Sequence, residues 1–545
     1  MSRELFSFNG GVHPPEHKSE SNTRPIHPPL LPRRLVIPLR QHIGTPAKPI
    51  VEVGERVLKG QMIAAADGAI SAAIHASSSG IVTAIDLQTM PHASGLPDLC
   101  ISIDTDGRDE WAPRTPLDYQ QYTPASLLAQ LRDFGLAGLG GAVFPSAVKL
   151  EASEAIPTLI LNGGECEPWI TCDDMLMRQH AREILQGLTV MRHMLGSTEI
   201  LVGIEDNKPE ALAAMQSAAA TLDFAVDVIA VPTRYPSGGG KQMIKMLTGK
   251  EVPSGKLPTD IGIQMFNVGT AYALYHAVFL GEPLISRIVT VTGHVLRPQN
   301  MHVLIGTPMQ VLIDAAGERD GSSGVLMGGP MMGVAMPNTQ VPVVKATNCV
   351  LVQSRELFAP LPPALPCIRC ARCADACPAN LQPQDLFRFA KVDDFDRAQA
   401  YHLFDCIECG CCNYVCPSHI PLVDFYRYAK AQIGARAQEK QAADLARDRH
   451  EFRLMRLARD KAEKADKLAA RAQAQRTAQP SGDPEAEAKR ALIADALVRV
   501  QAHKTQTPRN TDDLPAHAQQ QIDETDKRRA LAEASPPSDS SQENA

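Results

Sequence analysis

The chain carries the run C-I-R-C-A-R-C-A-D-A-C-P at residues 367–378 and the run C-I-E-C-G-C-C-N-Y-V-C-P at residues 406–417. Each run fits the pattern C-x-x-C-x-x-C-x-x-x-C-P, which holds a 4Fe–4S cluster in ferredoxins. Zinc ribbons, one alternative, use two C-x-x-C pairs that a longer loop separates. Paired disulfides are the other alternative. Because the full pattern occurs twice, the sequence predicts two 4Fe–4S clusters and one-electron chemistry.

In two-cluster proteins the fourth cysteine of each run ligates the cluster of the other run. We therefore assign Cys367, Cys370, Cys373 and Cys416 to cluster 1, and Cys377, Cys406, Cys409 and Cys412 to cluster 2. Cys411 lies inside the second run but off its spacing, so we expect a free thiol. Arg369 and Arg372 flank the first cluster and Glu408 flanks the second, and such charges can give two clusters different potentials.

The length of 545 residues is enough for three or four domains. The formal net charge of −7 is small for this length and does not suggest a nucleic-acid partner. No stretch approaches about 18 consecutive apolar residues, so we expect membrane attachment only through partners. The N-terminus has no signal-peptide pattern, which places the cysteines in a reducing cytosol as thiols.

Residues 1–33 are rich in proline and predict an extended N-terminal arm. Short strands alternate with turn signals in residues 34–115. The phrases at 53–61 and 74–82 resemble the barrel-sandwich fold of biotinyl and lipoyl carrier domains. The hairpin between them, residues 66–70, has no lysine to carry a prosthetic group. The resemblance therefore implies the fold without the carrier chemistry.

Residues 120–285 have the pattern of a parallel sheet covered by helices. Strand-like and helical stretches alternate there, at 158–161, 181–194, 199–203, 209–222 and 225–229.

Three loops in this region can carry chemistry. The first, G-L-G-G-A-V-F-P-S-A-V-K at residues 138–149, has glycines that admit an anion to backbone amides, and a lysine that adds positive charge. The second, N-G-G-E-C-E-P at residues 162–168, follows a strand at the edge where parallel sheets bind ligands. The third runs from Y-P-S-G-G-G-K-Q at residues 235–242 to N-V-G-T at residues 267–270. Their alternatives are a tight structural turn, a solvated turn and a flexible linker, respectively.

The first loop resembles the G-R-G-G-A-G-F-P-T-G-x-K loop of the flavin- and NADH-binding subunit of respiratory complex I. The second resembles that subunit's N-A-D-E-x-E-P loop, and residues 267–270 resemble its N-N-V-E-T segment. Combined with the two cysteine runs, residues 5–430 resemble the C subunit of the Rnf (also called Rsx) ion-translocating electron transport complex. The phrases F-x-G-G-V-H-P-P-E, G-I-E-D-N-K-P and M-G-G-P-M-M-G carry that resemblance as well.

The resemblance implies sites for FMN and for NADH, and it implies roles by position. Gly138, Gly140, Gly141 and Lys149 would face the FMN and nucleotide phosphates, and Phe144 would stack on the nucleotide. Asn162 and Glu165 would hold the isoalloxazine, Asn267 and Thr270 would complete the flavin pocket, and Glu167 would be the catalytic residue near the nicotinamide.

The chain departs from the complex I pattern at three places in these loops. Leu139 stands where that loop has arginine, Val143 where it has glycine, and Gly238–Gly240 where it has Gly-Glu-Glu. We expect a side chain at position 143 to narrow the approach of a nucleotide.

The sequence predicts a multidomain α/β plus α+β protein. Its predicted parts are the arm (1–33), a barrel-sandwich module (34–115), an FMN/NADH-binding α/β domain (120–285), a β-grasp module that resembles soluble-ligand-binding modules (286–345), a helical ferredoxin-type two-cluster domain (346–430), and a charged helical, then disordered, tail (431–545).

The predicted function is that of a peripheral electron-transfer subunit at the cytoplasmic face of the inner membrane. As an NADH-dependent oxidoreductase subunit of an ion-coupled translocase, it would pass electrons between NADH, FMN and partner subunits of the Rnf/Rsx complex, with ferredoxin as a further candidate partner. One alternative is a flavin and iron–sulfur corrin (cobalamin) reductase. The other is an electron relay without an active NADH site.

Overall fold

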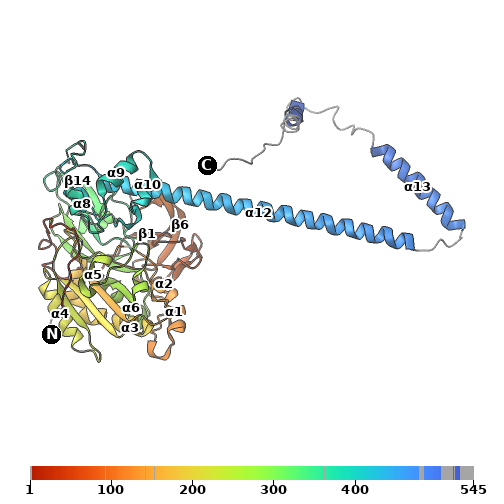
Figure 1. The fold of residues 1–545 in the computed structure, drawn as a ribbon. Coiled ribbons are helices and arrows are strands. Elements are labelled where there is room, and N and C mark those ends of the chain that lie inside the picture. The colour runs from red at the N-terminus through yellow and green to blue at the C-terminus, as the bar shows by residue number, and fades with distance from the viewer. Residues whose placement is uncertain are drawn as a thin grey trace. The chain divides into compact units, whose positions relative to one another are not determined.

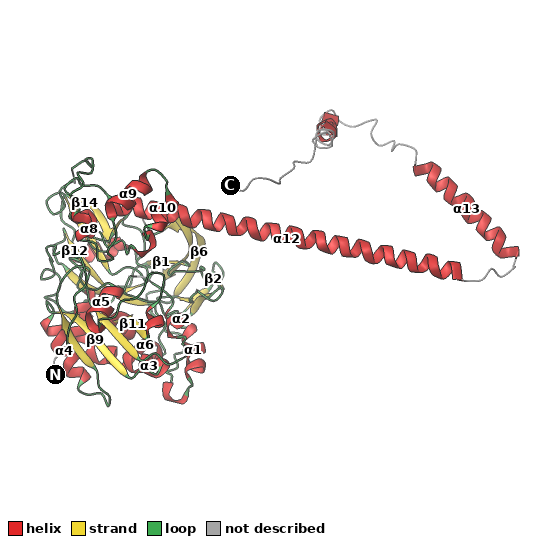
Figure 2. Cartoon of the chain, viewed as in Figure 1, coloured by secondary structure: helices red, strands yellow, loops and turns green. Residues whose placement is uncertain are grey.

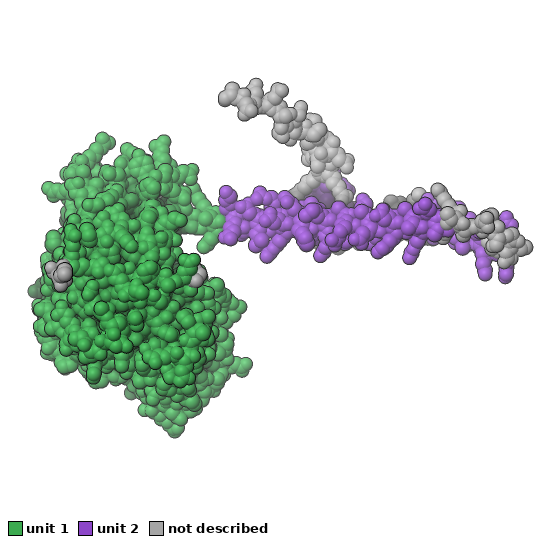
Figure 3. Space-filling model, turned by 60° about the horizontal axis from the view of Figure 1, so that its bottom comes forward, with its two compact units in different colours: residues 1–439 green, residues 440–545 purple. Residues whose placement is uncertain are grey.

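The computed structural model describes residues 3–92, 94–141, 143–152, 154–360, 362–477, 484–504, 519–520 and 522–527. The chain divides into two compact units, residues 1–439 and residues 440–545 (Figure 3). The first unit contains all the strands that the structure describes and both cysteine runs (Figure 2). The second unit contains most of helix α12 (Leu422–Thr477) and all of α13 (Pro484–Lys504).

The N-terminal part of the first unit is a sandwich of two small antiparallel sheets. One has the strand order β1-β7-β6-β3, and the other β2-β4-β5. Their bounds are Arg34–Pro38 (β1), Lys48–Pro49 (β2), Arg56–Val57 (β3), Met62–Ala65 (β4), Ile74–His75 (β5), Gly80–Thr89 (β6) and Pro97–Thr105 (β7). Leu35, Ile63, Val82 and Ile101 are buried between the sheets. The predicted hairpin at residues 66–70 connects β4 to β5.

The α/β part is built on a four-stranded sheet with the order β10-β9-β8-β11, in which all neighbours are parallel. The strands are Thr158–Gly163 (β8), Glu199–Glu205 (β9), Asp227–Val231 (β10) and Ile263–Asn267 (β11). The helices are Pro124–Arg132 (α1), Ser146–Leu150 (α2), Cys172–Leu195 (α3), Pro209–Ala219 (α4), Gly240–Thr248 (α5) and Val268–Leu280 (α6), and short 3-10 turns lie at Tyr119–Gln121 (η1) and Pro258–Ile261 (η2). All of β8 is buried, as expected for a central parallel strand with both faces covered. Helices α3, α4, α5 and α6 lie together in this part of the chain (Figure 1).

Helix α3 begins nine residues before the helical stretch that the sequence predicts. His180 has non-helical backbone angles inside α3, so the helix is kinked there. The predicted stretch at 181–194 is the half after the kink. The half before it, with Met175 and Leu176 buried, begins close to the second loop and matters for the site.

The next sheet has the order β13-β12-β16-β14-β15. Its elements are Ser286–Gly293 (β12), Gln299–Leu304 (β13), Met309–Ala316 (α7), Ser322–Met327 (β14), Val334–Ala335 (β15) and Cys349–Ser354 (β16). Strand β16 lies between β12 and β14, parallel to the former and antiparallel to the latter. The sheet therefore extends beyond residue 345, where we placed the end of this module, because the apolar run C-V-L-V fills its centre.

The cysteine-rich part consists of short helices: Arg372–Asp375 (α8), Pro383–Lys391 (α9), Phe395–Ala400 (α10), the 3-10 turn Leu403–Asp405 (η3) and Cys411–Tyr414 (α11). The spacer between the runs is divided into α9 and α10 at Asp393 and Asp394. Asp393 has a left-handed backbone (φ 57°), and the Asp394 side chain caps α10 by accepting a hydrogen bond from the Arg397 amide.

Helix α12 begins at Leu422, before the predicted start of the tail at residue 431. Its first turns belong to the cysteine-rich core, where Leu422, Val423, Tyr426 and Ala429 are buried. The predicted disordered stretch lies mostly outside the described residues. In the part of the chain that the structure describes, no helix has the length and apolar character needed to cross a membrane.

Candidate functional site

The cysteines of the two runs line two separate cavities. Cys367, Cys370, Cys373 and Cys416 line one cavity. Cys377, Cys406, Cys409 and Cys412 line the other, and Cys411 lines it as well. The interleaved sets predicted from the spacing are thus brought together in space, each by three cysteines of one run and the fourth of the other.

Four soft sulfur ligands around a small cavity suit an iron–sulfur cluster. Burial raises the pKa of Cys406 to about 11 and also raises the pKa of Cys373 and Cys377. Burial disfavours the charged thiolate of these three cysteines, and a bound metal ion would stabilise it. The ligand assignment itself remains a prediction.

The two runs also repeat an unusual backbone conformation. Arg369 and Ala371 of the first run have φ of 58° and 61°, and the equivalent Glu408 and Gly410 of the second have 58° and 77°. Only glycine adopts this left-handed region without strain. The same strained turn at equivalent positions of both runs shows that each loop is curled around its cavity in the same way.

The charges that flank the two cavities differ in how they are paired. Glu408 accepts hydrogen bonds from Arg427 at 2.9 Å and from Lys430 at 2.8 Å. Within the described residues, the exposed Arg369 and Arg372 have no ion-pair partner within 4.0 Å. The positive charge beside the first cavity is therefore left for solvent or for another molecule.

The loops of the α/β part meet at the carboxyl edge of its sheet. The Asn162 side chain donates to the Gly238 carbonyl at 2.9 Å and accepts from the Gly164 amide at 2.8 Å, which joins the second loop to the third. The Asn267 side chain caps α6 by accepting from the Gly269 amide at 2.8 Å. Thr270 accepts a hydrogen bond from the Leu139 amide at 3.0 Å, which fastens the first loop to the start of α6.

The glycines of the first loop differ in the space around them. A Cβ on Gly140 would approach the Asn267 Cβ to 3.0 Å. Gly141 has φ of 102° and has open space where a Cβ would be. The Gly138 amide donates to the Phe144 carbonyl at 2.8 Å and closes the loop, and Phe144 is half-buried.

Val143 is buried and has φ of 43°, a left-handed conformation that is a clear outlier for a β-branched residue. The complex I loop has glycine at this position, so the chain keeps the turn that glycine would favour and adds a side chain to it. Lys149, the last residue of this loop, lies in α2. Its ammonium donates to the Met265 carbonyl at 2.5 Å, and burial lowers its pKa to about 8.

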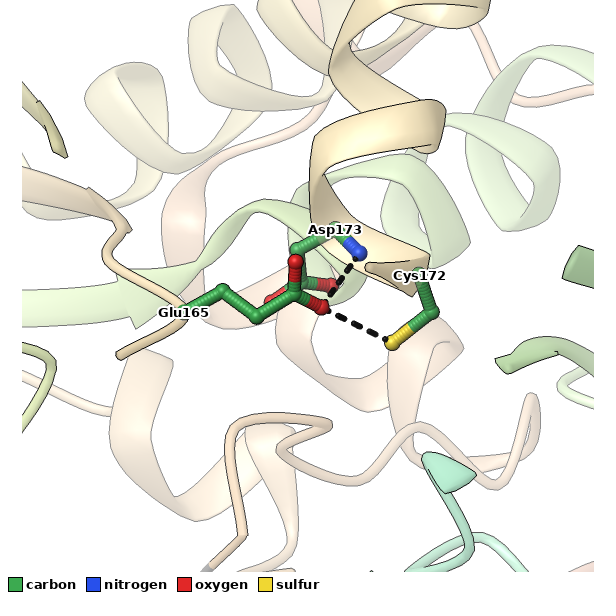
Figure 4. Close-up of side chains that lie close together, drawn as sticks. All are labelled: Glu165, Cys172 and Asp173. Atoms are coloured by element: carbon green, nitrogen blue, oxygen red, sulfur yellow. Dashed lines mark hydrogen bonds between the residues drawn. The ribbon is translucent and has the colours of Figure 1, made fainter. Parts of the chain in front are cut away.

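Glu165 is buried, and its carboxylate caps the N-terminus of α3 (Figure 4). Its carboxylate accepts from the Asp173 amide at 2.8 Å and from the Cys172 thiol at 3.3 Å. The Asp173 carboxylate lies beside it and accepts from the Asn267 side chain at 2.6 Å. Burial, followed by the charge of Glu165, raises the pKa of Asp173 to about 7.

Asp173 is a site residue that the sequence reasoning missed. It connects two predicted flavin-pocket residues, because its backbone amide donates to Glu165 and its carboxylate accepts from Asn267. The signal in the sequence was C-D-D directly after the second loop, where acidic residues open a helix.

Glu167 is directed toward the sheet that follows the α/β part. It accepts from the Met331 amide at 2.7 Å and from the Met332 amide at 3.1 Å, both in the turn between β14 and β15. Burial raises its pKa.

Lys18 of the N-terminal arm binds the backbone of the second loop through its ammonium group. Its buried ammonium donates to the carbonyls of Glu165 (2.7 Å), Glu167 (3.0 Å) and Ile170 (2.7 Å).

The α/β loops contact the second cysteine run directly. The Tyr235 hydroxyl donates to the Cys409 carbonyl at 2.6 Å. Cys166, from the second loop, packs in one apolar cluster with Tyr235, Cys409 and Cys411. The arm contacts the first cysteine run, since the Gly11 amide donates to the carbonyl of Ala376 at 2.9 Å, and Ala376 packs in the same apolar cluster.

Family models match four parts of the chain. They are described as the RnfC barrel sandwich hybrid domain (residues 6–108), the Nuo51 FMN-binding domain (131–276), the SLBB domain (288–335) and the 4Fe-4S dicluster domain (366–420).

Curated relatives named as the C subunit of an ion-translocating oxidoreductase complex match most of the chain. One from Vibrio cholerae is 45% identical over 93% of this chain and 65% of its own length, and one from Pseudomonas aeruginosa is 47% identical over 85% and 60%. One from Yersinia pestis is 47% identical over 84% of this chain and 74% of its own length. The chain thus spans about two thirds or less of the length of the first two relatives.

A solved NAD⁺-reducing [NiFe]-hydrogenase aligns with 52% of this chain and 57% of its own at a TM-score of 0.41 and 19% identity, too little to compare sites. The order of the four matched domains, the two cysteine-lined cavities and the identity to relatives along most of the chain agree with one another. The chain belongs to the family of the C subunit of the ion-translocating oxidoreductase complex.

Proposed function

We propose that this protein is the electron-transfer subunit of a membrane-bound, ion-translocating oxidoreductase complex. It would exchange electrons with NADH at a bound FMN, and with partner subunits through two 4Fe–4S clusters. The observation that carries the proposal is the contact between the ligand-binding edge of the α/β sheet and the second cysteine run, through Tyr235 and Cys409. Electron transfer requires a flavin site close to an iron–sulfur site, whereas two unrelated functions would not require the two sites to be in contact.

The two cluster sites would be held by the two cysteine sets that line the cavities. Cys367, Cys370, Cys373 and Cys416 would ligate cluster 1, and Cys377, Cys406, Cys409 and Cys412 would ligate cluster 2. The repeated left-handed turns at Arg369 and Glu408 support this assignment, because a loop curled around a cluster needs them.

The residues at the sheet edge fit a flavin phosphate and ring. Gly141 leaves open space on the first loop, and the amides at the start of α6 face an edge where an anion is favoured. Asn162, Glu165, Asn267 and Thr270 form the hydrogen-bonded frame of that edge, with Gly138 and Gly140 allowing the first loop to close over it. FMN would supply the conversion between a two-electron hydride and single electrons.

NADH would approach past the first loop, near Phe144, with Glu167 on the side of the second loop. Lys149 would reach a phosphate only by leaving the Met265 carbonyl. The buried side chain of Val143 favours a second candidate function, in which the flavin and clusters relay electrons and no nucleotide binds.

The partners would be the membrane and redox subunits of the complex, and the chain would sit on the cytoplasmic face of the inner membrane without spanning it. Its modules would be the arm (1–33), the barrel sandwich (34–115), the flavin domain (120–285), the β-grasp sheet (286–354), the two-cluster domain with the first turns of α12 (355–439), and the charged tail.

The test is anaerobic analysis of iron, sulfide and flavin in the purified protein, followed by titration with NADH. We expect about eight iron atoms and one flavin per chain, since two cubane clusters hold four irons each, and bleaching of the flavin absorbance by NADH. Full cofactor content without bleaching at millimolar NADH would leave the relay function. Absence of either cofactor from anaerobically prepared protein would refute the proposal.

A further inference from the structure

The barrel sandwich contacts the first loop of the α/β part through one short segment. The Ile43 amide donates to the Val143 carbonyl at 3.2 Å, so the two modules are joined where the first loop has its left-handed residue. Gly141, on the same loop, is exposed and has open space where a Cβ would be. This segment of the barrel sandwich therefore lies beside the loop that we expect to bind a nucleotide.

The hairpin that lacks a carrier lysine, residues 66–70, packs against the same segment. The Thr45 amide donates to the Ile70 carbonyl at 3.0 Å, and the Ser71 hydroxyl donates to the Thr45 carbonyl at 2.9 Å. Gly44 has φ of 111°, and a Cβ there would come within 2.2 Å of the Ile70 carbonyl oxygen and 2.6 Å of the Ile70 Cγ2. Glycine permits both this conformation and this close approach, so the hairpin is held firmly beside the first loop.

We call residues 42–45 and 66–71 the sandwich tip. Two large apolar side chains are exposed on it, Ile43 at 56% and Ile70 at 41%. Its one carboxylate, Asp67, is paired with Lys48 at 3.1 Å. Burial lowers the pKa of His42, which keeps that ring neutral. The surface of the tip is therefore apolar and carries no uncompensated charge.

We propose that the sandwich tip is one wall of the nucleotide site, where Ile43 and Ile70 contact the purine base of the dinucleotide. The inference rests on the proposed function, because it needs NADH as the substrate. Backbone amides beside glycines suit phosphate groups, whereas the flat faces of a base suit aliphatic side chains. The nicotinamide must meet the flavin at the edge of the sheet, which leaves the purine for the exposed side of the first loop.

The test compares two electron donors that differ in the purine. NADH contains adenine, whereas reduced nicotinamide mononucleotide keeps the hydride-donating ring and lacks the adenine. Anaerobic rapid mixing with the cofactor-loaded protein measures the second-order rate constant for flavin bleaching by each donor. We expect Ile43→Ser and Ile70→Ser each to lower the ratio of the NADH constant to the mononucleotide constant about fivefold, because each removes apolar surface that would cover the base.

Two matched controls make the same chemical change elsewhere on the barrel sandwich. Ile50 is 56% exposed, and its amide donates to the Ile63 carbonyl instead of to the first loop. Ile81 is 39% exposed and pairs with Arg56 in β3. Ile50→Ser and Ile81→Ser should leave the ratio unchanged. Flavin content is measured on every variant, so that a loss of cofactor is not taken for a loss of nucleotide binding.

Three results would overturn the proposal while the proposed function stands. They are equal rate constants for the two donors in the wild type, equal effects of a tip variant on both donors, and equal ratios in the tip variants and their controls. If neither donor bleached the flavin of the fully loaded wild type, the NADH-dependent function would fail and this inference with it. That failure is recognised in the wild type, before any variant is made.

Discussion

The hydroxyl of Tyr235 donates a 2.6 Å hydrogen bond to the backbone carbonyl of Cys409, so a loop of the α/β sheet and the second cysteine run share a buried contact. Tyr235→Phe removes the donor and leaves that carbonyl without it. A buried polar group left unsatisfied costs about 1–3 kcal/mol, so we expect the free energy of unfolding to fall by that amount. We also expect a changed electron paramagnetic resonance signal for one cluster, because hydrogen bonds near a cluster tune it.

Tyr428→Phe is the control for this change. The Tyr428 hydroxyl donates to Asp393 at 3.0 Å, but the side chain is 43% exposed, so water replaces the lost partner. We expect a stability change within about 0.5 kcal/mol and unchanged cluster signals. Equal effects of the two variants would mean that the Tyr235 contact does not couple the two parts.

The sequence was most informative where chemistry depends on local spacing. The C-x-x-C-x-x-C-x-x-x-C-P pattern grouped eight cysteines into two sets, and each set lines one of the two cavities, the second together with Cys411. Local patterns also predicted the parallel strands β8, β9 and β10. They could not predict β16, because its place at the centre of the sheet depends on pairing with β12, more than 50 residues earlier.

The supporting contacts of the site depend on still longer separations in the chain. Lys18 contacts carbonyls about 150 residues away, and Asn267 contacts Asp173 across 94 residues. The sequence around Lys18 or Asn267 does not indicate that either residue has such a distant partner. The sequence could not predict the left-handed backbone at Arg369 and Val143 either, because arginine and valine ordinarily adopt φ below zero.

Lys18 should be a positioning residue for the second loop. Lys18→Met keeps the length of the side chain and removes all three hydrogen bonds to the carbonyls of Glu165, Glu167 and Ile170. Loss of buried polar partners predicts a drop of about 3–5 kcal/mol in the free energy of unfolding, measured in urea. We also expect weaker flavin retention during gel filtration, because this loop frames the proposed flavin site.

Lys48→Met provides the comparison, since Lys48 is exposed and pairs with Asp67 at 3.1 Å. Such a surface pair contributes about 0–1 kcal/mol. If Lys18→Met lowered the free energy of unfolding as little as Lys48→Met, then the arm would cover the second loop without stabilising it.

Asp173 should make stability depend on pH. Burial raises its folded pKa to about 7, above the usual 3.8, so between these values the unfolded chain releases the proton while the folded chain keeps it. The folded state therefore loses stability as pH rises from about 4 to 7, and the loss is complete above 7. Asp173→Asn cannot titrate and can still accept the hydrogen bond from Asn267.

The free energy of unfolding of Asp173→Asn minus that of the wild type should be larger at pH 8 than at pH 5. Each pH unit across which the two states differ contributes about 1.4 kcal/mol. Urea denaturation of both proteins at the two pH values measures the difference. A constant difference between them would show that Asp173 does not titrate in this range.

Substitutions of the adjacent residues Cys411 and Cys412 distinguish the loss of a cluster ligand from the disturbance of a buried side chain. Both are buried beside the second cavity, but only Cys412 falls on the cluster spacing. Cys412→Ser should lower the iron content from about eight to about four per chain and remove one cluster signal, since each cubane holds four irons. Cys411→Ser should keep both signals and cost only the stability of a buried polar substitution, about 1–3 kcal/mol. Loss of iron in Cys411→Ser with retention in Cys412→Ser would give the ligand position assigned to Cys412 to Cys411. That exchange would change the loop geometry, because residue 411 opens α11 directly after the left-handed Gly410, whereas residue 412 lies one position further along the helix.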